Sequence, residues 1–380
     1  MDFKLSEEQE LVRQNMREFA QTYVDPIAVE IDENSRYPEE VIKRLGAMGW
    51  MGMPYPAEYG GAGTDYLTYA VAVEELSRSC AATGFTMSVH TGLAAGPIFY
   101  FGNEEQKKKY LTPLCNGQAL GAFALTEPGA GTDVGAATTM ITKDGDDYII
   151  NGTKTFTSNG PNGDIYVVFG WTNKEAGGSK GMSAFIVPKG TPGMSVGGHF
   201  KKMGIRASQT SEMVFKDCRV PKENLIGQEG MGLKIAMGSF DNGRIGIAAQ
   251  AVGIAQAALD ESISYAKQRI QFGKPISKNQ AIQWMIADMA TEVQAGRFMY
   301  MYAAWLKDQG LPYTKEASMA KVWCAEMCSK HASKAVQIHG GYGYCKGFKV
   351  ERLMRDAKIT EIYEGTSEAQ RMVIAGNVLR

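Results

Sequence analysis

The pattern of apolar, polar and turn-forming residues changes twice along the sequence, and these two changes limit the folds that it can adopt. Between about residues 118 and 228, short runs rich in β-branched and aromatic residues alternate with Gly, Asn, Asp and Pro, as in DIYVVFGW and SEMVFKDCRVP. This spacing is typical of antiparallel strands in a small barrel or sandwich. Because no long helical stretch separates the runs, the pattern disfavours a Rossmann domain, in which strands alternate with helices.

Helical patterns lie on both sides of this segment. The stretch from residue 1 to about 117 begins with a capping box, Ser6-x-x-Gln9, before an apolar helical pattern. From 229 to 380, apolar residues recur at helical spacing, and prolines precede two long helices predicted at about 277–308 and 313–339. A last helix is predicted to start near Thr366 or Ser367, where Ser367-x-x-Gln370 is interpreted as another capping box. We expect the helical, β and helical segments to pack as one compact unit.

Composition narrows the class of protein. The 40 Lys and Arg against 41 Asp and Glu give a net charge of -1, which argues against a nucleic-acid binder. Six cysteines in 380 residues are too sparse for a disulfide scaffold, and Cys324, Cys328 and His331 lack a fourth ligand, so no metal site is predicted. The start, MDFKLSEEQELV, has neither signal-peptide nor transit-peptide character, and no apolar run of about 18 residues predicts a membrane span. A cytoplasmic protein with no membrane partner is expected.

The first cluster with chemical potential is LTEPGAGTD, residues 125–133. Its two glycines, flanked by Thr126 and Thr132, leave backbone N–H groups free to approach an anionic or flat ligand. The segment lacks the G-x-G-x-x-G form and a strand pattern follows it, so the dinucleotide fingerprint is not met. From the motif alone, a plain turn and a ligand-binding loop both remain open.

Two further clusters lie near the C-terminus. The segment QIHGGYG (337–343) ends a predicted helix, where a glycine pair is most often a C-cap, and His339 is interpreted as structural. The segment IYEGTSE (362–368) places Glu364 just before a helix start. A carboxylate there either interacts favourably with the helix N-terminus or acts as a general base whose pKa is raised by burial.

Seven motifs follow one another along the chain: ALTEPGAGTD (124–133), NGTKTFTSNG (151–160), KMGIR (202–206), GRIGIAAQAVGIAQAALD (243–260), RIQFGKP (269–275), QIHGGYGY (337–344) and MRDAKITEIYEGTSEAQR (354–371). In this order they resemble the acyl-CoA dehydrogenase family over essentially the whole chain, most closely its short-chain or butyryl-CoA branch. The resemblance implies an α+β multidomain chain, with an N-terminal α-helical domain (1–117), a middle antiparallel β-barrel-like domain (118–228) and a C-terminal four-helix bundle (229–380). It further implies non-covalent FAD between the β-domain and the bundle, an acyl-CoA substrate, an electron-transferring flavoprotein as partner, and a homotetramer.

Matched motif by motif, the resemblance assigns residues to the cofactor and the substrate. Residues expected against the flavin and pyrophosphate are Phe123, Leu125, Thr126, Thr132, Phe156 and Ser158, and those near the adenosine and phosphate end are Thr366 and Glu368. Residues expected to reach the FAD of a partner subunit are Arg269, Phe272, Gln280, Gln337, Gly340 and Gly341. The thioester and pantetheine arm are expected beside Thr132, Asp241, Arg244 and Gly365.

Glu364 matches the catalytic-base position of the short- and medium-chain branches. The isovaleryl-type branch carries its base at the position of Gly243, which has no side chain here. The resemblance therefore predicts dehydrogenation of an acyl-CoA to the trans-2-enoyl-CoA, with Glu364 removing the α-proton and hydride leaving to flavin N5. Two departures stand out: Phe156 replaces a Trp of many relatives, and Phe200 replaces an acidic residue near the electron-transferring flavoprotein surface.

The acyl group and the direction of reaction stay open at this stage. The stretch 88–97 matches the helix that lines the acyl pocket, and its small residues either leave room for a branched or aryl group or pack closely against a neighbouring helix: Gly92, Ala94, Ala95 and Gly96. The same site can run as an enoyl-CoA reductase. An oxidase-like variant is disfavoured by the short chain, and a non-catalytic acyl-CoA-binding relative would be expected to lose the base or the flavin loop.

Overall fold

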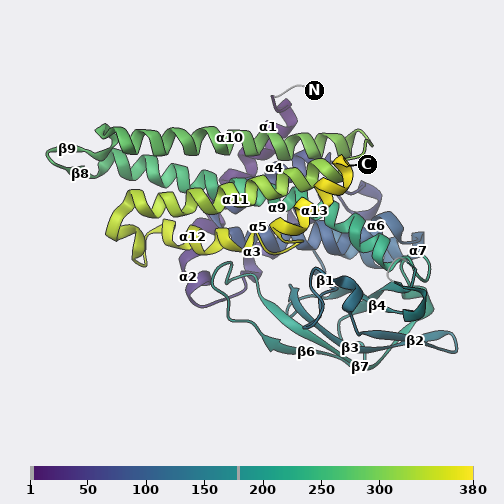
Figure 1. Ribbon diagram of the computed structural model, residues 1–380. Coiled ribbons are helices and arrows are strands. Elements are labelled where there is room, and N and C mark those ends of the chain that lie inside the picture. The colour runs from purple at the N-terminus through teal and green to yellow at the C-terminus, as the bar shows by residue number, and fades with distance from the viewer. Residues whose placement is uncertain (1–3, 178–179, 380) are drawn as a thin grey trace.

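The protein is described by a computed structural model covering residues 4–177 and 180–379. The predicted order of helical, β and helical segments is confirmed (Figure 1). The N-terminal helices are α1 (Glu7–Phe19), α2 (Ala28–Glu33), α3 (Glu39–Ala47), α4 (Tyr66–Ser79), α5 (Ala81–Ser88), α6 (Gly96–Phe101), α7 (Glu104–Gln106) and α8 (Thr112–Cys115). The strands of the main sheet are β1 (Gly121–Ala124), β2 (Met140–Asp144), β3 (Asp147–Ser158), β4 (Ile165–Trp171), β5 (Met182–Pro188), β6 (Met194–His199) and β7 (Thr210–Pro221).

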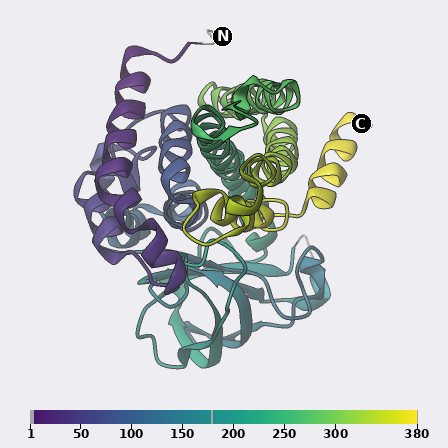
Figure 2. The same ribbon diagram turned by 90° about the vertical axis from the view of Figure 1, so that its left-hand side faces the viewer.

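The C-terminal helices are α9 (Gly232–Gln268), α10 (Gln280–Asp308), α11 (Thr314–His339), α12 (Lys349–Ile359) and α13 (Ser367–Val378). A two-stranded hairpin, β8 (Ile270–Gln271) and β9 (Lys274–Pro275), joins α9 to α10. The helices α9 to α12 pack against one another as a bundle, and α13 packs on α11. Figure 2 shows the sheet below the bundle, with α1 and α13 on opposite sides of it.

Local sequence signals explain where several helices begin. The predicted capping box of α1 is confirmed, since Ser6 Oγ accepts from the Gln9 N–H and the Gln9 side chain accepts from the Ser6 N–H. The second predicted box is wrong. Helix α13 is capped one residue earlier, by Thr366, whose hydroxyl accepts from the Ala369 N–H at 3.2 Å. Gln370 is thereby free to turn back toward the segment before the helix.

The middle sheet departs from the all-antiparallel pattern at β4, which pairs in parallel with both β1 and β2. The strand order is β1-β4-β2-β3-β7-β6, with β5 beside β4, and β1 pairs with β4 in parallel over Gly121–Ala124. The chain leaves β1, forms the β2–β3 hairpin, and returns to β4 in the direction of β1, so this pair cannot be antiparallel. All seven residues of β4 are buried, as expected for a strand covered on both faces.

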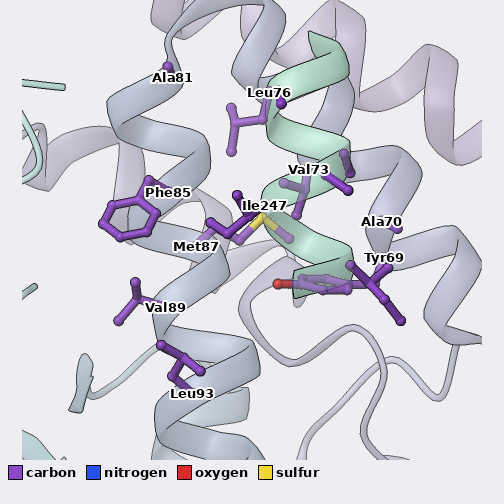
Figure 3. Close-up of a cluster of buried hydrophobic side chains, with 14 of the residues drawn as sticks. Tyr69, Ala70, Val73, Leu76, Ala81, Phe85, Met87, Val89, Leu93 and Ile247 are labelled. Atoms are coloured by element: carbon purple, nitrogen blue, oxygen red, sulfur yellow. The ribbon is translucent and has the colours of Figure 1, made fainter. Parts of the chain in front are cut away.

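Small residues on α9 let the N-terminal helices approach it closely. A Cβ at Gly253 would lie 2.3 Å from the Glu74 carbonyl oxygen of α4, a distance that no side chain tolerates. Nearer the start of α9, Ile247 packs in the core with Val73 of α4 and Met87 of α5 (Figure 3). This packing brings α4, α5 and the π-helical Val89–Ala95 segment against the part of α9 that faces Glu364. Within the described residues, no helix is long and apolar enough to cross a membrane.

Candidate active site

Glu364 lies in the short segment between α12 and α13. Its backbone has a φ of 52°, and Gly365 follows with a φ of 94°. Positive φ is uncommon for a residue with a side chain and often occurs at functional sites. The side chain is buried, and neither carboxylate oxygen has a hydrogen-bond partner among residues 4–177 and 180–379. Burial raises the pKa of Glu364 to about 8, while the positive charges of Lys321 and Arg244 oppose this rise.

Gly243 of α9 makes room for this carboxylate. A Cβ at Gly243 would lie 1.8 Å from Glu364 Oε2 and 3.0 Å from Leu93 Cδ2. Any larger residue would have to displace the carboxylate. Glu364 can therefore occupy this position only because residue 243 is a glycine. The family's two alternative base positions, Glu364 and Gly243, are neighbours in space.

Asp241 and Arg244 lie one turn apart on α9. Arg244 Nη1 donates to Asp241 Oδ1 at 2.7 Å, and Asp241 Oδ2 accepts from Thr314 Oγ1 at 2.6 Å. Arg244 Nε is buried and has no hydrogen-bond partner in the part of the chain that the structure describes. Burial raises the pKa of Asp241 and lowers that of Arg244. The pair places a charged donor with unused capacity beside Glu364, whose negative charge in turn raises the pKa of Arg244.

Two side chains that the sequence analysis missed hold the Glu364 segment. Lys321 Nζ of α11 donates to the Gly365 carbonyl at 2.7 Å, and Gln370 Nε2 of α13 donates to the same carbonyl at 2.8 Å and to the Glu364 carbonyl at 3.3 Å. Lys321 is fully buried. The available signal was its position at helical spacing between Ala317 and Cys324, on the apolar face of its helix, where a lysine needs a specific reason.

The LTEPGAGTD segment is both a tight turn and an open loop. Glu127 and Ala130 exchange two backbone hydrogen bonds of 3.0 Å each. Beside Gly129 and Gly131, an added Cβ would meet no atom of the described residues within 4 Å. Leu125 is buried, Thr126 is partly buried, and Thr132 is exposed.

A buried ion pair, also missed from the sequence, anchors this loop. Lys154 Nζ of β3 donates to Glu127 Oε1 at 2.7 Å and to the Leu125 carbonyl at 3.0 Å. Glu127 also accepts from the Thr138 N–H at 2.6 Å and the Thr139 N–H at 3.0 Å. These bonds lower the pKa of Glu127 to about 2, against the effect of its burial. The loop is therefore tied to β3 and to the start of β2.

The aromatic residues predicted beside the cofactor differ in exposure. The Phe123 ring packs 4.8 Å from Phe169 and 5.7 Å from Phe240 of α9, so it belongs to the core. Phe156 is 61% exposed, has a φ of 52° and lies 4.6 Å from the Phe200 ring. Ser158, at the end of β3, is partly buried.

The remaining predicted cofactor residues fall into two groups at opposite ends of the bundle (Figure 1). One group surrounds the β8–β9 hairpin and the end of α11, with Arg269 over the Tyr342 ring at 5.4 Å and Phe272 97% exposed. Its other members are Gln280, Gln337, Gly340 and Gly341. The second group, Thr366 and Glu368, lies at the start of α13 beside Glu364. A single chain therefore does not bring the two groups together.

The helical stretch predicted to line an acyl pocket packs closely on α9. A Cβ at Gly92 would lie in ordinary contact with Gly243 Cα, at 3.7 Å, and one at Gly96 would lie 3.9 Å from Asn242 Nδ2. An alanine would make the same contacts at either position, so helix packing does not by itself require these two glycines. Among the described residues, no group of three or more His, Cys, Asp or Glu side chains is arranged to hold a metal ion, and His339 is structural, stacked 4.2 Å from Tyr265.

Comparison with known proteins gives a consistent result. Sequence profiles for the N-terminal, middle and C-terminal domains of acyl-CoA dehydrogenases match residues 6–118, 122–218 and 230–379. The chain is 54% identical to a short-chain specific acyl-CoA dehydrogenase of Clostridium acetobutylicum, over 100% of both chains. Its fold superposes on butyryl-CoA dehydrogenase from Megasphaera elsdenii with a TM-score of 0.98 and 46% identity, over 100% of both chains. A chain solved in a study of the electron transferring flavoprotein of Acidaminococcus fermentans gives a TM-score of 0.99 and 49% identity, again over 100% of both chains.

Proposed function

Because this chain belongs to the acyl-CoA dehydrogenase family, we propose that it dehydrogenates short-chain acyl-CoA thioesters to trans-2-enoyl-CoA products, with Glu364 as the base. The observation that carries the proposal is the buried Glu364 carboxylate, whose two oxygens have no hydrogen-bond partner. A general base needs an accessible lone pair and a pKa near the working pH, and burial provides the raised pKa of about 8. The short-chain relative and the butyryl-CoA enzyme support a short acyl group.

The predicted cofactor residues have the properties that FAD requires. Open backbone beside Gly129 and Gly131 allows close approach of a pyrophosphate, and the exposed Phe156 ring offers a flat apolar face. When bound, FAD supplies the acceptor for the hydride that leaves the β-carbon. We further propose that the residues around the β8–β9 hairpin serve the FAD of a neighbouring subunit. Their separation from Glu364 within one chain supports the contribution of a second subunit, and the family resemblance makes a homotetramer the proposed assembly.

The mechanism follows from how this chain holds its own groups. Glu364 takes the α-proton of the substrate, while its backbone N–H donates to the thioester carbonyl and stabilises the negative charge that develops on that oxygen. Asp241 and Arg244 orient the substrate arm, and the unpaired Arg244 Nε provides a donor for it. The left-handed backbone at Glu364 and Gly365 sets the direction in which the Glu364 side chain and N–H leave the segment.

An electron-transferring flavoprotein is proposed as the electron acceptor. The likeness to a chain solved with such a flavoprotein under study supports this choice. Near the predicted cofactor site, the exposed Phe156 ring lies 4.6 Å from the partly buried Phe200 ring, at the position where many relatives carry an acidic residue near the partner surface. The predicted cytoplasmic location stays a prediction.

A spectrum of the purified protein tests the proposal. We expect a bound flavin whose absorbance is bleached by butyryl-CoA, with crotonyl-CoA formed, and Glu364→Gln that retains flavin and binds butyryl-CoA but loses this bleaching. Longer acyl-CoAs measure the chain-length limit, and crotonyl-CoA with a reduced electron donor measures the reverse reaction. A protein that takes up no FAD, or a Glu364→Gln variant with substantial turnover, would contradict the assignment.

A further inference from the structure

Lys321 is an unusual lysine because its whole side chain is buried and, among the described residues, its ammonium donates to a single carbonyl oxygen. It is 0% exposed, and its Nζ donates to the Gly365 carbonyl at 2.7 Å. Within the described part of the chain, Lys321 takes part in no ion pair shorter than 4 Å, in contrast to the buried Lys154, which pairs with Glu127 at 2.7 Å. A buried cation without a direct carboxylate partner is costly. Its charge must therefore be offset by something further away.

The charged groups around Glu364 identify that offset. Two positive charges act on Glu364, that of Lys321 from α11 and that of Arg244 from α9. The phenols of Tyr69 and Tyr363 stay neutral, because burial and the charge of Glu364 raise their pKa values. Arg244 is already paired with Asp241 at 2.7 Å. The negative charge of Glu364 has the largest effect in raising the pKa of Lys321, ahead of the charges of Glu361 and Glu368, while Arg244 lowers it. Glu361 is already paired with Lys358 at 2.7 Å, so Glu364 is the main offset for the Lys321 charge.

We propose that Lys321 is a positioning residue of this reaction, which fixes the Gly365 carbonyl and supplies a positive charge that favours the ionised form of Glu364, the form that takes the α-proton. The inference rests on the proposed function of Glu364. Gln370 donates to the same carbonyl but carries no charge. Both side chains therefore fix the position of the segment, and Lys321 also changes the proton affinity of Glu364.

The electrostatics support this division. Burial raises the pKa of Glu364 to about 8, and the charge of Lys321 is the largest influence that lowers it. Burial also lowers the pKa of Lys321 to about 8, with Glu364 opposing that fall. At neutral pH the ammonium is therefore charged, and its loss would make the carboxyl hold its proton to higher pH.

Substitutions at Lys321 separate charge from structure. Lys321→Met removes the charge and the donor, Lys321→Gln keeps a donor without charge, and Lys321→Arg keeps the charge. We expect the acidic limb of the kcat/KM profile to move to higher pH by about 1 pH unit in the Met and Gln variants and to stay near its original pH in the Arg variant. Activity lost near neutral pH would then return at higher pH.

Lys202→Met is the matched control. Lys202 Nζ also donates to a single carbonyl, that of Ser208 at 2.7 Å, and burial lowers the pKa of Lys202 to about 8, but it does not act on Glu364. We expect its acidic limb to coincide with that of the unmodified protein. If Lys321→Met and Lys321→Gln lose activity equally at every pH, Lys321 has a structural role alone and the proposal is overturned.

A direct titration keeps this test independent of turnover. The infrared C=O band of the protonated carboxyl, taken as the difference from Glu364→Gln, reports the protonation of Glu364 in the flavin-loaded protein. We expect its midpoint to rise in Lys321→Met or, if that variant does not fold, in Lys321→Gln. An unmoved midpoint would overturn the inference. An unmodified protein that shows the band but does not dehydrogenate acyl-CoA would instead overturn the proposed function.

Discussion

Replacing Glu364 by Gln should make the stability of the protein less dependent on pH, and in a direction that the structure fixes. Burial raises the pKa of Glu364 from 4.5 to about 8. Between these two values the folded state holds a proton that the unfolded state has released, so the free energy of unfolding falls as pH rises. Stability associated with this group is complete below about pH 4.5 and is lost progressively as pH rises through about 8.

The size of the effect follows from the same two values. Each tenfold difference in proton affinity corresponds to about 1.4 kcal/mol. The free energy of unfolding should therefore fall by at most about 2.5 kcal/mol between pH 5 and pH 7, and by at most about 5 kcal/mol in total between low pH and pH values above 9. A glutamine of the same shape carries no charge at any pH. The stability of Glu364→Gln relative to the unmodified protein should therefore increase steadily from about pH 5 to about pH 9.

Denaturation midpoints of the two flavin-loaded proteins at matched pH measure this difference. Comparing variants at each pH cancels the other buried carboxyl groups, such as Asp356, whose pKa burial raises to about 6. Glu30→Gln is the control, because Glu30 is exposed and its pKa is lowered, so it should show no growing advantage at high pH. A difference between Glu364→Gln and the unmodified protein that stays constant across this range would refute the reasoning.

Three other substitutions test separate parts of the structure. Gly243→Ala places a Cβ 1.8 Å from Glu364 Oε2, so the base must move, and kcat should fall by about 100-fold while flavin binding is retained; an unchanged kcat would contradict the geometry. Lys154→Met leaves Glu127 buried without its partner and should lower the free energy of unfolding by about 3–5 kcal/mol and weaken FAD binding, measured by urea denaturation and flavin titration. Ser6→Ala removes the cap of α1 and should lower stability by about 1 kcal/mol with kcat unchanged, so a loss of activity there would indicate a coupling that the structure does not contain.

The sequence predicted the features that depend on local chemistry or on motif order. Neighbouring residues are enough to predict the α1 capping box, the long helices and the change from helical to β-strand patterns. Short motifs in a fixed order are enough for the resemblance that singled out Glu364. The parallel pairing of β1 with β4 was not predicted, because local spacing reports that a strand exists but not which strand lies beside it.

Long-range side-chain contacts were equally out of reach. Lys321 and Gly365 are separated by 44 positions in the sequence, and Lys154 and Glu127 by 27. The position of Lys321 on the apolar face of its helix indicates burial, but in both cases only the fold shows which group the lysine contacts. The cap of α13 was assigned one residue too late for a related reason: Gln370 bonds to the Glu364 segment, so it is unavailable to a capping box.

These contacts explain how the chain maintains a site that is unfavourable in isolation. Glu364 combines a buried, unpaired carboxylate with a left-handed backbone, and each feature alone disfavours the folded state. The groups that oppose them come from three helices: Lys321 from α11, Gln370 from α13 and the space at Gly243 from α9. No single helix could supply all three, since one helix presents only one narrow face to a point outside it. Enclosure by several helices of the C-terminal domain is therefore what allows the base to stay desolvated and in place, and a substitution in any of these helices should alter its proton affinity or its position before it alters the fold.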